Sequence, residues 1–177
     1  MSKKISRRDF IKTTAAAGGA AALMPQTIFS SQNKKNLRIG FIGTGLRGQW
    51  MLWLATKYPD VEIPAICDID DGMISAALKI IKDSGREEPK VYKKNDEDFR
   101  NLVKNEDLDG VYIATPWEWH HPMAIAAMKA GIHVGTEVPA ALTVNECWDL
   151  VNVSEKTEKF CMIMENVCYR RDVMAVL

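Results

Sequence analysis

The 177-residue chain has no excess of either charge, since 23 lysines and arginines balance 23 aspartates and glutamates. Generic binding of nucleic acid depends on clustered cations, so this balance argues against nucleic acid as a partner. The four cysteines show no Cys-x-x-Cys pair and no metal-type spacing with the three histidines: Cys67, Cys147, Cys161 and Cys168. We expect small buried thiols rather than a disulfide framework, and no metal site.

The sequence is not poor in hydrophobic residues, because 47% of the residues are apolar and 26% are charged. This composition is sufficient for a folded core and excludes an intrinsically disordered or low-complexity protein. The length fits one ordinary domain.

The first thirty residues have the features of an export signal. A basic start precedes an Ala- and Gly-rich run of about a dozen residues, too short for a membrane helix of about 20 residues. Within it, Ser6 to Lys12 reads Ser-Arg-Arg-Asp-Phe-Ile-Lys and resembles the bacterial twin-arginine signal, with a basic amphipathic helix as the alternative. We therefore expect a signal peptide over 1–30, the twin-arginine export machinery as a partner, a periplasmic location and no stable membrane anchor.

A glycine-rich turn follows a linker at 31–36. Residues 37–43 form a short apolar run typical of a buried parallel strand, and they lead into a Gly-x-Gly-x-x-Gly pattern at Gly43, Gly45 and Gly48. A helix is predicted over 49–57, with Trp50 and its apolar neighbours in its core. Asp68 ends the next predicted strand, at 61–68, about twenty residues after the last glycine. This context predicts a dinucleotide site.

Each residue of the pattern has a physical role. Gly43 permits the tight turn, Gly45 lets the backbone approach a pyrophosphate, and Gly48 allows close packing of helix on strand. The helix N-terminus offers free N–H groups to the phosphates. The Asp68 carboxylate would accept hydrogen bonds from the ribose and repel a 2′-phosphate, which favours NAD over NADP, although Arg47 partly offsets the repulsion.

Strands and helices continue to alternate along the chain. Strands are predicted at 89–92, 110–116, 133–139 and 160–166, and helices at 98–105, 122–130 and 143–156. Pro122 and Gly131 mark the ends of one helix, and Thr143 with Glu146 forms a capping box for another. This alternation predicts an α/β fold, a doubly wound parallel sheet, over residues 37–168.

The last residues, 169–177, begin a helix without a stop signal. We interpret them as the start of a connection to a C-terminal α/β substrate domain that this chain lacks. The chain would then be an N-terminal fragment, inactive alone.

Two segments resemble the glucose–fructose oxidoreductase/inositol dehydrogenase (Gfo/Idh/MocA) family: Ala114-Thr-Pro116 and Gly135-Thr-Glu-Val-Pro139. Its members usually carry Glu-Lys-Pro in the second segment, where the lysine helps to polarise the substrate hydroxyl; here the residue is Val138. Three longer segments, at 117–122, 136–141 and 164–172, resemble glycoside hydrolase family 109. These are exported, NAD-dependent α-N-acetylgalactosaminidases of the same superfamily.

The resemblance implies an NAD site and a redox-neutral hydrolysis. Hydride would leave C3 of the sugar, the C2 proton and the leaving group would follow, water would add at C1, and the hydride would return. Paired carboxylates are not needed for this route. The catalytic residues stay unknown and would belong to the absent domain, so His120 has a cofactor-loop role only. Beside the three glycines, the implied cofactor residues are Leu46, Arg47, Asp68, Trp117, Glu118, Trp119, His120, Glu137, Val138 and Asn166.

Two other functions stay open, an exported NAD(P)-dependent sugar oxidoreductase and a non-catalytic NAD-binding fragment. Export favours the glycosidase, because the periplasm has no NAD pool and a self-recycling cofactor needs none. In an extended segment Trp117 and Trp119 would face the same way, either as a wall beside nicotinamide or sugar or packed under the loop. A terminal α-N-acetylgalactosaminide glycan is the implied substrate, and a homo-oligomer is left open.

Overall fold

The computed structural model describes residues 36–176. The expectations for the signal peptide at 1–30 and for most of the linker lie outside the described residues. Within 36–176, no helix is both long and apolar enough to cross a membrane.

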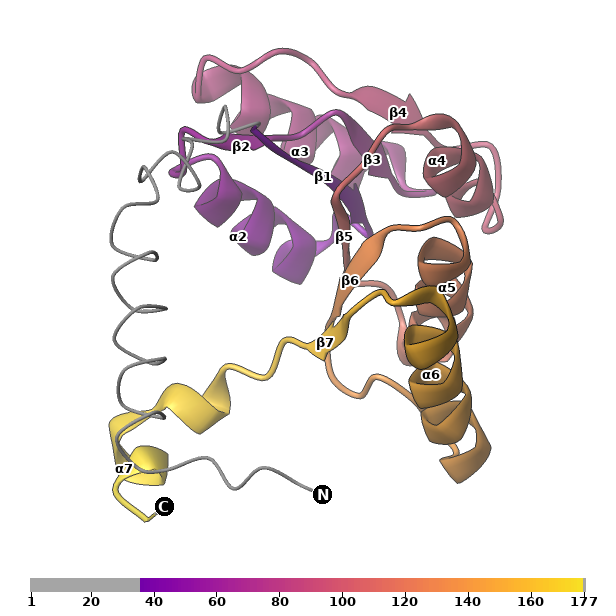
Figure 1. Ribbon diagram of the computed structural model, residues 1–177. Coiled ribbons are helices and arrows are strands. Elements are labelled where there is room, and N and C mark those ends of the chain that lie inside the picture. The colour runs from indigo at the N-terminus through magenta and orange to yellow at the C-terminus, as the bar shows by residue number, and fades with distance from the viewer. Residues whose placement is uncertain (1–35, 177) are drawn as a thin grey trace, which may run out of the picture. The chain divides into compact units, whose positions relative to one another are not determined.

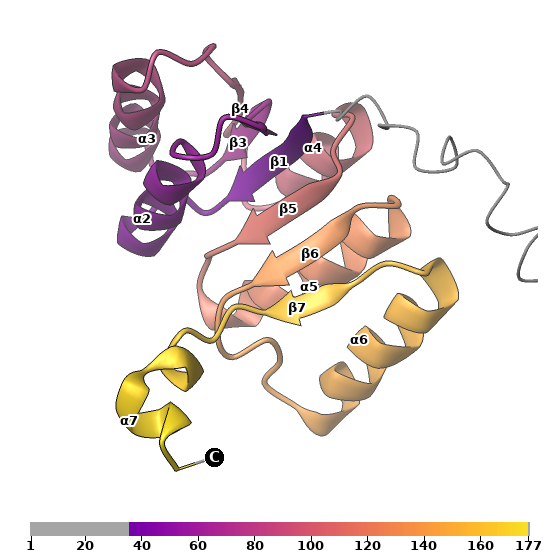
Figure 2. The same ribbon diagram turned by 60° about the vertical axis from the view of Figure 1, so that its left-hand side comes forward.

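The strands form one parallel sheet, shown in Figure 2, in the order β4-β3-β1-β5-β6-β7. Their bounds are β1 (Leu37–Ile42), β3 (Ala65–Cys67), β4 (Lys90–Tyr92), β5 (Gly110–Ile113), β6 (His133–Thr136) and β7 (Cys161–Ile163), and β2 (Val61–Glu62) pairs with the start of β1. The chain runs outward from β1 to β4 and then crosses back to β5. This confirms the predicted doubly wound sheet, whose reversal lies between β1 and β5.

Helices cover the sheet on two sides, as Figure 1 shows. One side carries α2 (Leu46–Ala55) and α3 (Asp71–Asp83), and the other carries α4 (Phe99–Asn105), α5 (Trp117–Lys129) and α6 (Val144–Thr157). Successive strand residues point to opposite faces, so Phe41 joins the core under α2 and α3 while Ile42 joins the core under α4 to α6. A short 3₁₀ turn (Val167–Tyr169) and α7 (Arg171–Met174) follow β7, so the helix predicted near the end of the chain is short.

Helix α3 fills a stretch, 69–88, for which the sequence analysis assigned no element. Asp70 caps it, because its Oδ1 accepts hydrogen bonds from the backbone N–H groups of Gly72 and Met73 at 2.7 and 3.0 Å. Ile74, Ala77 and Ile81 face the sheet and are buried. The helix supplies the crossover that two neighbouring parallel strands, β3 and β4, require.

Several predicted boundaries are wrong by a few residues. The strand predicted at 61–68 is interrupted at Pro64, whose nitrogen carries no proton for the ladder. The strands predicted at 110–116, 133–139 and 160–166 all end three residues earlier, because those residues form the loops at the carboxyl edge. Helix α5 begins at Trp117 rather than at Pro122.

Two predictions of burial are also wrong. Trp50 and Trp53 are 56% and 40% exposed and stack on each other at 5.2 Å on the outer surface of α2, where only Gly48 and Leu52 are buried. Cys147 and Cys168 are exposed, whereas Cys67 is buried. The capping box is confirmed, with both the Thr143 and the Glu146 hydrogen bonds present at the start of α6.

Candidate cofactor site

The glycine turn between β1 and α2 has the geometry that a dinucleotide requires. Gly43 has a φ of +86°, and a Cβ there would lie 2.6 Å from the carbonyl oxygen of Ala114. A Cβ on Gly48 would lie 2.0 Å from the carbonyl oxygen of Gly43. At Gly45, by contrast, a Cβ would meet nothing within 4 Å. The protein itself therefore requires the first and third glycines, while the second leaves open space beside the N-terminus of α2, where a pyrophosphate fits.

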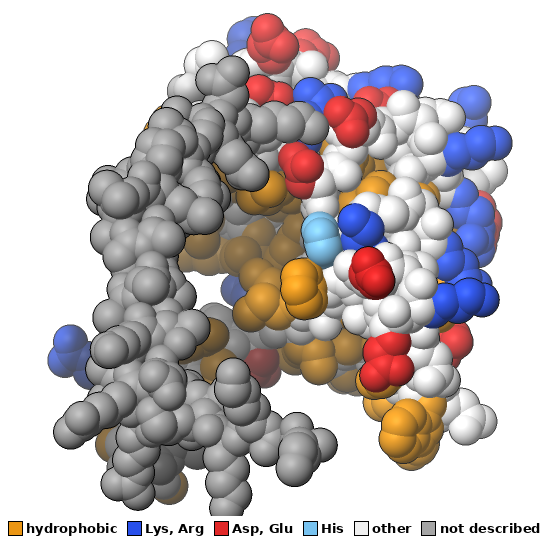
Figure 3. All heavy atoms as spheres, in the orientation of Figure 1, with side chains coloured by type: hydrophobic (Ala, Val, Ile, Leu, Met, Phe, Trp, Pro, Cys, Tyr) orange, Lys and Arg blue, Asp and Glu red, His pale blue; other side chains and the backbone are white. Residues whose placement is uncertain are grey.

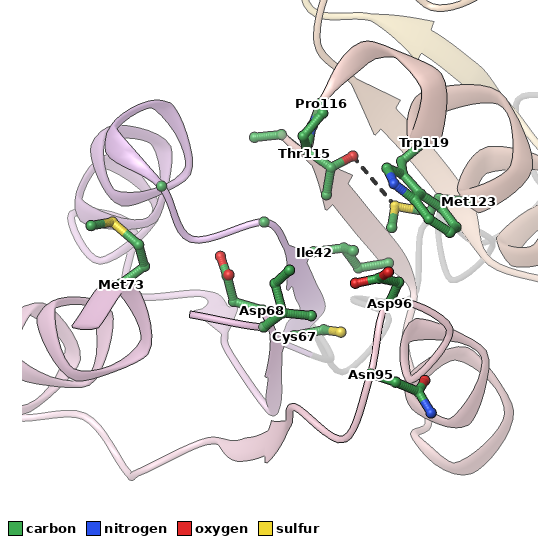
Figure 4. A pocket seen from close by; sticks show the side chains of 14 residues that line it. Ile42, Cys67, Asp68, Met73, Asn95, Asp96, Thr115, Pro116, Trp119 and Met123 are labelled. Atoms are coloured by element: carbon green, nitrogen blue, oxygen red, sulfur yellow. Dashed lines mark hydrogen bonds between the residues drawn. The ribbon is translucent and has the colours of Figure 1, made fainter. Parts of the chain in front are cut away.

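A cavity of about 290 Å³ opens beside this turn, at the carboxyl ends of β1, β3, β4 and β5 (Figure 4). Its place at the reversal of strand order is where ligands bind in such sheets. The volume suits part of a dinucleotide, because pockets for whole ligands of drug size take roughly 300–1,000 Å³. The lining residues are Ile42, Gly43, Gly45, Cys67, Asp68, Ile69, Met73, Asn95, Asp96, Ala114, Thr115, Pro116, Trp119 and Met123.

Asp68 is held rigidly at the end of β3. Its Oδ2 accepts hydrogen bonds from the backbone N–H and the hydroxyl of Thr44, at 2.5 and 2.9 Å. Its Oδ1 accepts a hydrogen bond from the backbone N–H of Asp70 at 3.0 Å. These bonds fix the carboxylate against the glycine turn, where the sequence predicted a ribose contact. Thr44, which is fully buried, is a residue that the sequence analysis missed.

The walls of the cavity are apolar. Figure 4 shows Met73 on one side and Trp119 with Met123 on the other. The Trp119 ring packs edge-on against Phe99, with the ring centroids 6.1 Å apart. The expectation of an extended segment is wrong, because Trp117 and Trp119 lie in the first turn of α5, where residues two apart point in nearly opposite directions. Trp119 thus shares a cavity with Asp68, and Trp117 is 62% exposed.

His120 connects two loops at the carboxyl edge. It is 1% exposed, its Nδ1 lies 2.7 Å from the carbonyl oxygen of Pro139, and its Nε2 lies 2.8 Å from that of Thr115. The imidazole therefore joins the loop after β5 to the loop after β6.

Glu137, at the end of β6, is the centre of a second polar group. Its Oε1 accepts a hydrogen bond from Arg47 Nε at 2.7 Å and another from the hydroxyl of Tyr112. The bond to Glu137 raises the pKa of Arg47 above its ordinary value. Burial, together with the same carboxylate, raises the pKa of Tyr112. Hydrogen bonds among Arg47, Glu137 and Tyr112 thus link the start of α2 to the loop after β6.

The cavity floor holds Cys67, a buried thiol. Burial, with Asp98 and Asp68 nearby, raises its pKa to about 12. The thiol is therefore neutral at physiological pH and acts as a small apolar surface. Among residues 36–176, no group of three or more His, Cys, Asp or Glu side chains is placed to hold a metal ion.

The remaining predicted residues lie outside the cavity. Leu46 is 87% exposed on the turn, and Glu118 is exposed in the first turn of α5. Val138, 39% exposed, lines a separate groove beside α6, and Asn166 is exposed after β7. Conversely, Asn95 and Asp96 line the cavity although the sequence analysis did not select them. The rule that ligands bind at the carboxyl ends of strands could have found them, since they follow β4.

Two curated relatives match nearly the whole chain. It is 50% identical to a glycosyl hydrolase family 109 protein of Parabacteroides distasonis and 49% identical to an alpha-N-acetylgalactosaminidase of Tannerella forsythia, each over 97% of the chain. The chain spans about 40% of the length of these relatives. Residues 4–24 match the signal sequence of the twin-arginine translocation pathway, which indicates export to the periplasm by that route.

Among solved structures, myo-inositol 2-dehydrogenase from Lactobacillus plantarum superposes with a TM-score of 0.67 at 26% identity, over 80% of this chain and 40% of that one. Residues 37–165 match the oxidoreductase family with an NAD-binding Rossmann fold. That match covers most of the described residues, including the glycine turn, Asp68 and Glu137. The chain therefore belongs to the Gfo/Idh/MocA oxidoreductase family and contains its NAD-binding Rossmann domain.

Proposed function

We propose that NAD lies across the glycine turn with its adenosine in the cavity that Asp68 lines. The open space at Gly45 and the rigid Asp68 carboxylate support this placement. Leu46 and Arg47 would border the pyrophosphate at the start of α2. The nicotinamide would then extend past the turn toward Glu137, Val138 and Asn166, on the far side from Asp68.

We further propose that the whole protein is an exported, NAD-dependent glycosidase that cleaves terminal α-linked N-acetylgalactosamine. The observation that carries this proposal is the identity of 49–50%, over 97% of the chain, to two relatives, one named as a glycosyl hydrolase family 109 protein and the other as an alpha-N-acetylgalactosaminidase. The export signal supports it as well, because a cofactor that is restored in every cycle needs no external pool.

Val138 favours a glycosidase over a sugar oxidoreductase of the same family. The residue stands where the family's dehydrogenases usually place a lysine, and a valine cannot polarise a substrate hydroxyl. Arg47, a cation at this edge, is bound to Glu137. The loop after β6 would therefore support the cofactor, with its carboxylate, Glu137, already bound to Arg47 and Tyr112.

When bound, NAD would accept a hydride from the sugar and return it, so that the overall hydrolysis is redox-neutral. The residues of this chain would bind and orient the cofactor. Asp68 would hold the ribose, Trp119 and Met73 would exclude water from the base, and His120 would keep the two loops in position. Proton transfer would be left to groups outside the described residues.

The complete gene product, purified and assayed without added NAD on p-nitrophenyl α-N-acetylgalactosaminide, tests the activity. We expect nitrophenol without net accumulation of NADH. Accumulation of NADH with a free sugar and added NAD⁺, and no nitrophenol, would identify a sugar oxidoreductase. Cofactor binding with neither reaction would identify a non-catalytic NAD-binding protein. Either result would overturn the glycosidase proposal.

Replacing Asp68 tests the placement of the cofactor. Asp68→Ala should weaken NAD binding about tenfold or more, because a charged hydrogen-bond acceptor is lost. Asp83→Ala, an exposed carboxylate near the end of α3, is the matched control and should leave the Kd unchanged. Since Asp68 also holds Thr44, the Tm without NAD separates a loss of stability from a lost ribose contact. Unchanged affinity for NAD would contradict the placement.

A further inference from the structure

Among the polar side chains of 36–176 that line the cavity, the Asp96 carboxylate is the one that the protein does not engage. Both oxygens of Asp68 accept hydrogen bonds, and the Thr115 hydroxyl faces the sulfur of Met123 at 3.4 Å. Asn95 Oδ1 accepts a hydrogen bond from the backbone N–H of Glu97 at 3.0 Å, and Figure 4 shows the amide turned away from the cavity. The Asp96 carboxylate is exposed and has no hydrogen bond or ion pair with any residue in 36–176. The cavity thus presents one unused acceptor, the carboxylate of Asp96.

The Asp96 carboxylate faces the space where the base of a dinucleotide would lie. Figure 4 shows the Asp96 carboxylate turned toward the cavity, below Trp119 and opposite Asp68. With the ribose at Asp68, a flat base would lie between Met73 and Trp119, and its edge would point to the loop after β4. Asn95 and Asp96 form that loop directly after β4 (Lys90–Tyr92).

The chemistry of this carboxylate matches adenine. The amino edge of adenine offers an exocyclic N–H₂ donor. A carboxylate accepts a hydrogen bond from that amino group. Hypoxanthine carries an oxygen in place of the amino group, and that oxygen would face the Asp96 carboxylate with no proton between them.

We propose that Asp96 recognises the amino group of adenine and makes this site selective for adenine dinucleotides over hypoxanthine dinucleotides. The inference rests on the proposed position of adenosine in the cavity. It assigns to the loop after β4 a specificity that neither the glycine turn nor Asp68 can supply, because those groups contact only the phosphates and the ribose.

The test compares the binding of NAD and of nicotinamide hypoxanthine dinucleotide to the complete protein freed of cofactor, by calorimetry. We expect NAD to bind about tenfold more tightly, as suits one hydrogen bond to a charged group. Asp96→Asn should reduce the ratio to about threefold or less, mainly through tighter binding of the hypoxanthine analogue, because an amide can donate as well as accept. Glu97→Gln is the matched control: its carboxylate pairs with Arg100 outside the cavity, so the ratio should not change.

The outcomes separate this inference from the proposed function. If wild type binds the two dinucleotides equally, or if Asp96→Asn keeps the full preference for NAD, the inference is wrong while the NAD site stands. If NAD fails to bind, or if Asp68→Ala binds it as wild type does, the position of adenosine itself is wrong. Asp96→Asn should keep the wild-type Tm without ligand, because this exposed carboxylate has no partner in 36–176.

Discussion

The two sides of the glycine turn are built differently. On the adenosine side, loops after β1, β3, β4 and β5 enclose a cavity whose fixed carboxylate, Asp68, is held mainly by backbone N–H groups. On the side of β6 and β7, Glu137, Arg47 and Tyr112 satisfy one another, and Met162 and Ile163 are 55% and 50% exposed. The buried cluster under α2 and α3 includes Tyr112 of β5 but no buried residue of β6 or β7.

Figure 3 shows a related contrast on one face of the molecule, where hydrophobic side chains gather toward the middle of the view and charged ones are spread over the helices at its right. If NAD binds as proposed, recognition and stability are separated along the carboxyl edge. Substitutions on the adenosine side should change affinity for the cofactor. Substitutions in the group around Glu137 should mainly change the free energy of unfolding.

The largest effect is expected where both sides meet, at Gly48. A Cβ there would lie 2.0 Å from the backbone oxygen of Gly43, so Gly48→Ala must displace the turn or the start of α2. We expect a loss of about 1–3 kcal/mol in the free energy of unfolding, together with weaker NAD binding. Urea titration and calorimetry measure the two quantities.

Gly45→Ala is the matched control for this substitution. A Cβ at Gly45 meets nothing within 4 Å, and the φ of Gly45 is −63°, so this variant should keep the stability of wild type. It should still bind NAD more weakly, because the methyl group occupies the space left for the pyrophosphate. A Gly48→Ala variant as stable as wild type would show that the turn is not the shared support of the two sides.

The glycine turn could be predicted from the sequence better than the rest of the carboxyl edge. Gly43 and Gly48 are specified by local backbone rules, and the structure places both where a Cβ would meet a backbone oxygen. The loop at Asn95 and Asp96 was missed because its role depends on the order of strands in the sheet, which no local pattern contains. Nor does a local pattern reveal the group around Glu137, since Arg47 and Glu137 are 90 residues apart.

Helix α5 shows a different limit of prediction from sequence. Pro122 is a good first residue for a helix, yet the helix begins five residues earlier, at Trp117. The buried imidazole of His120 lies within hydrogen-bond distance of the backbone of Thr115 and Pro139. These tertiary contacts hold the first turn of the helix, and they outweigh the local preference for a start at Pro122. The loss of one backbone donor at Pro122 is tolerated near the start of the helix.

An intermediate effect is expected at Glu137. Glu137→Gln keeps the size of the side chain but removes its charge, so the bonds from Arg47 and Tyr112 become weaker. Because Arg47 is partly exposed, we expect a loss of about 1–2 kcal/mol in the free energy of unfolding. Urea titration measures it, and Glu155→Gln on α6 is an exposed control. Equal stability of the Glu137 variant and wild type would contradict the structural role of this group.

The smallest expected effect is a pH dependence of the free energy of unfolding that differs between the two sides of the glycine turn. The pKa of Cys67, on the adenosine side, is raised from 9.0 to about 12 by burial, so the folded state keeps a proton that the unfolded state loses above pH 9. The contribution of Cys67 to the free energy of unfolding is therefore fully present below pH 9. The free energy of unfolding should fall by about 1 kcal/mol between pH 9 and pH 10. The pKa of Tyr112, near Glu137, is raised from 10.0, so its contribution is lost only above pH 10.

Urea titrations at several pH values between 8 and 11 would resolve these two contributions. Cys67→Ala should remove the largest part of the decline that begins at pH 9, and Tyr112→Phe should flatten only the later part. The pKa values of Cys161 and Tyr92 are raised in the same direction, so a smaller slope should remain in both variants. Cys147→Ala, at an exposed thiol, should leave the whole curve unchanged.

A Cys67→Ala variant with the wild-type slope would mean that this thiol is as accessible to water in the folded chain as in the unfolded one. The cavity floor would then not be closed, and the contrast between the two sides of the turn would fail at its most buried point.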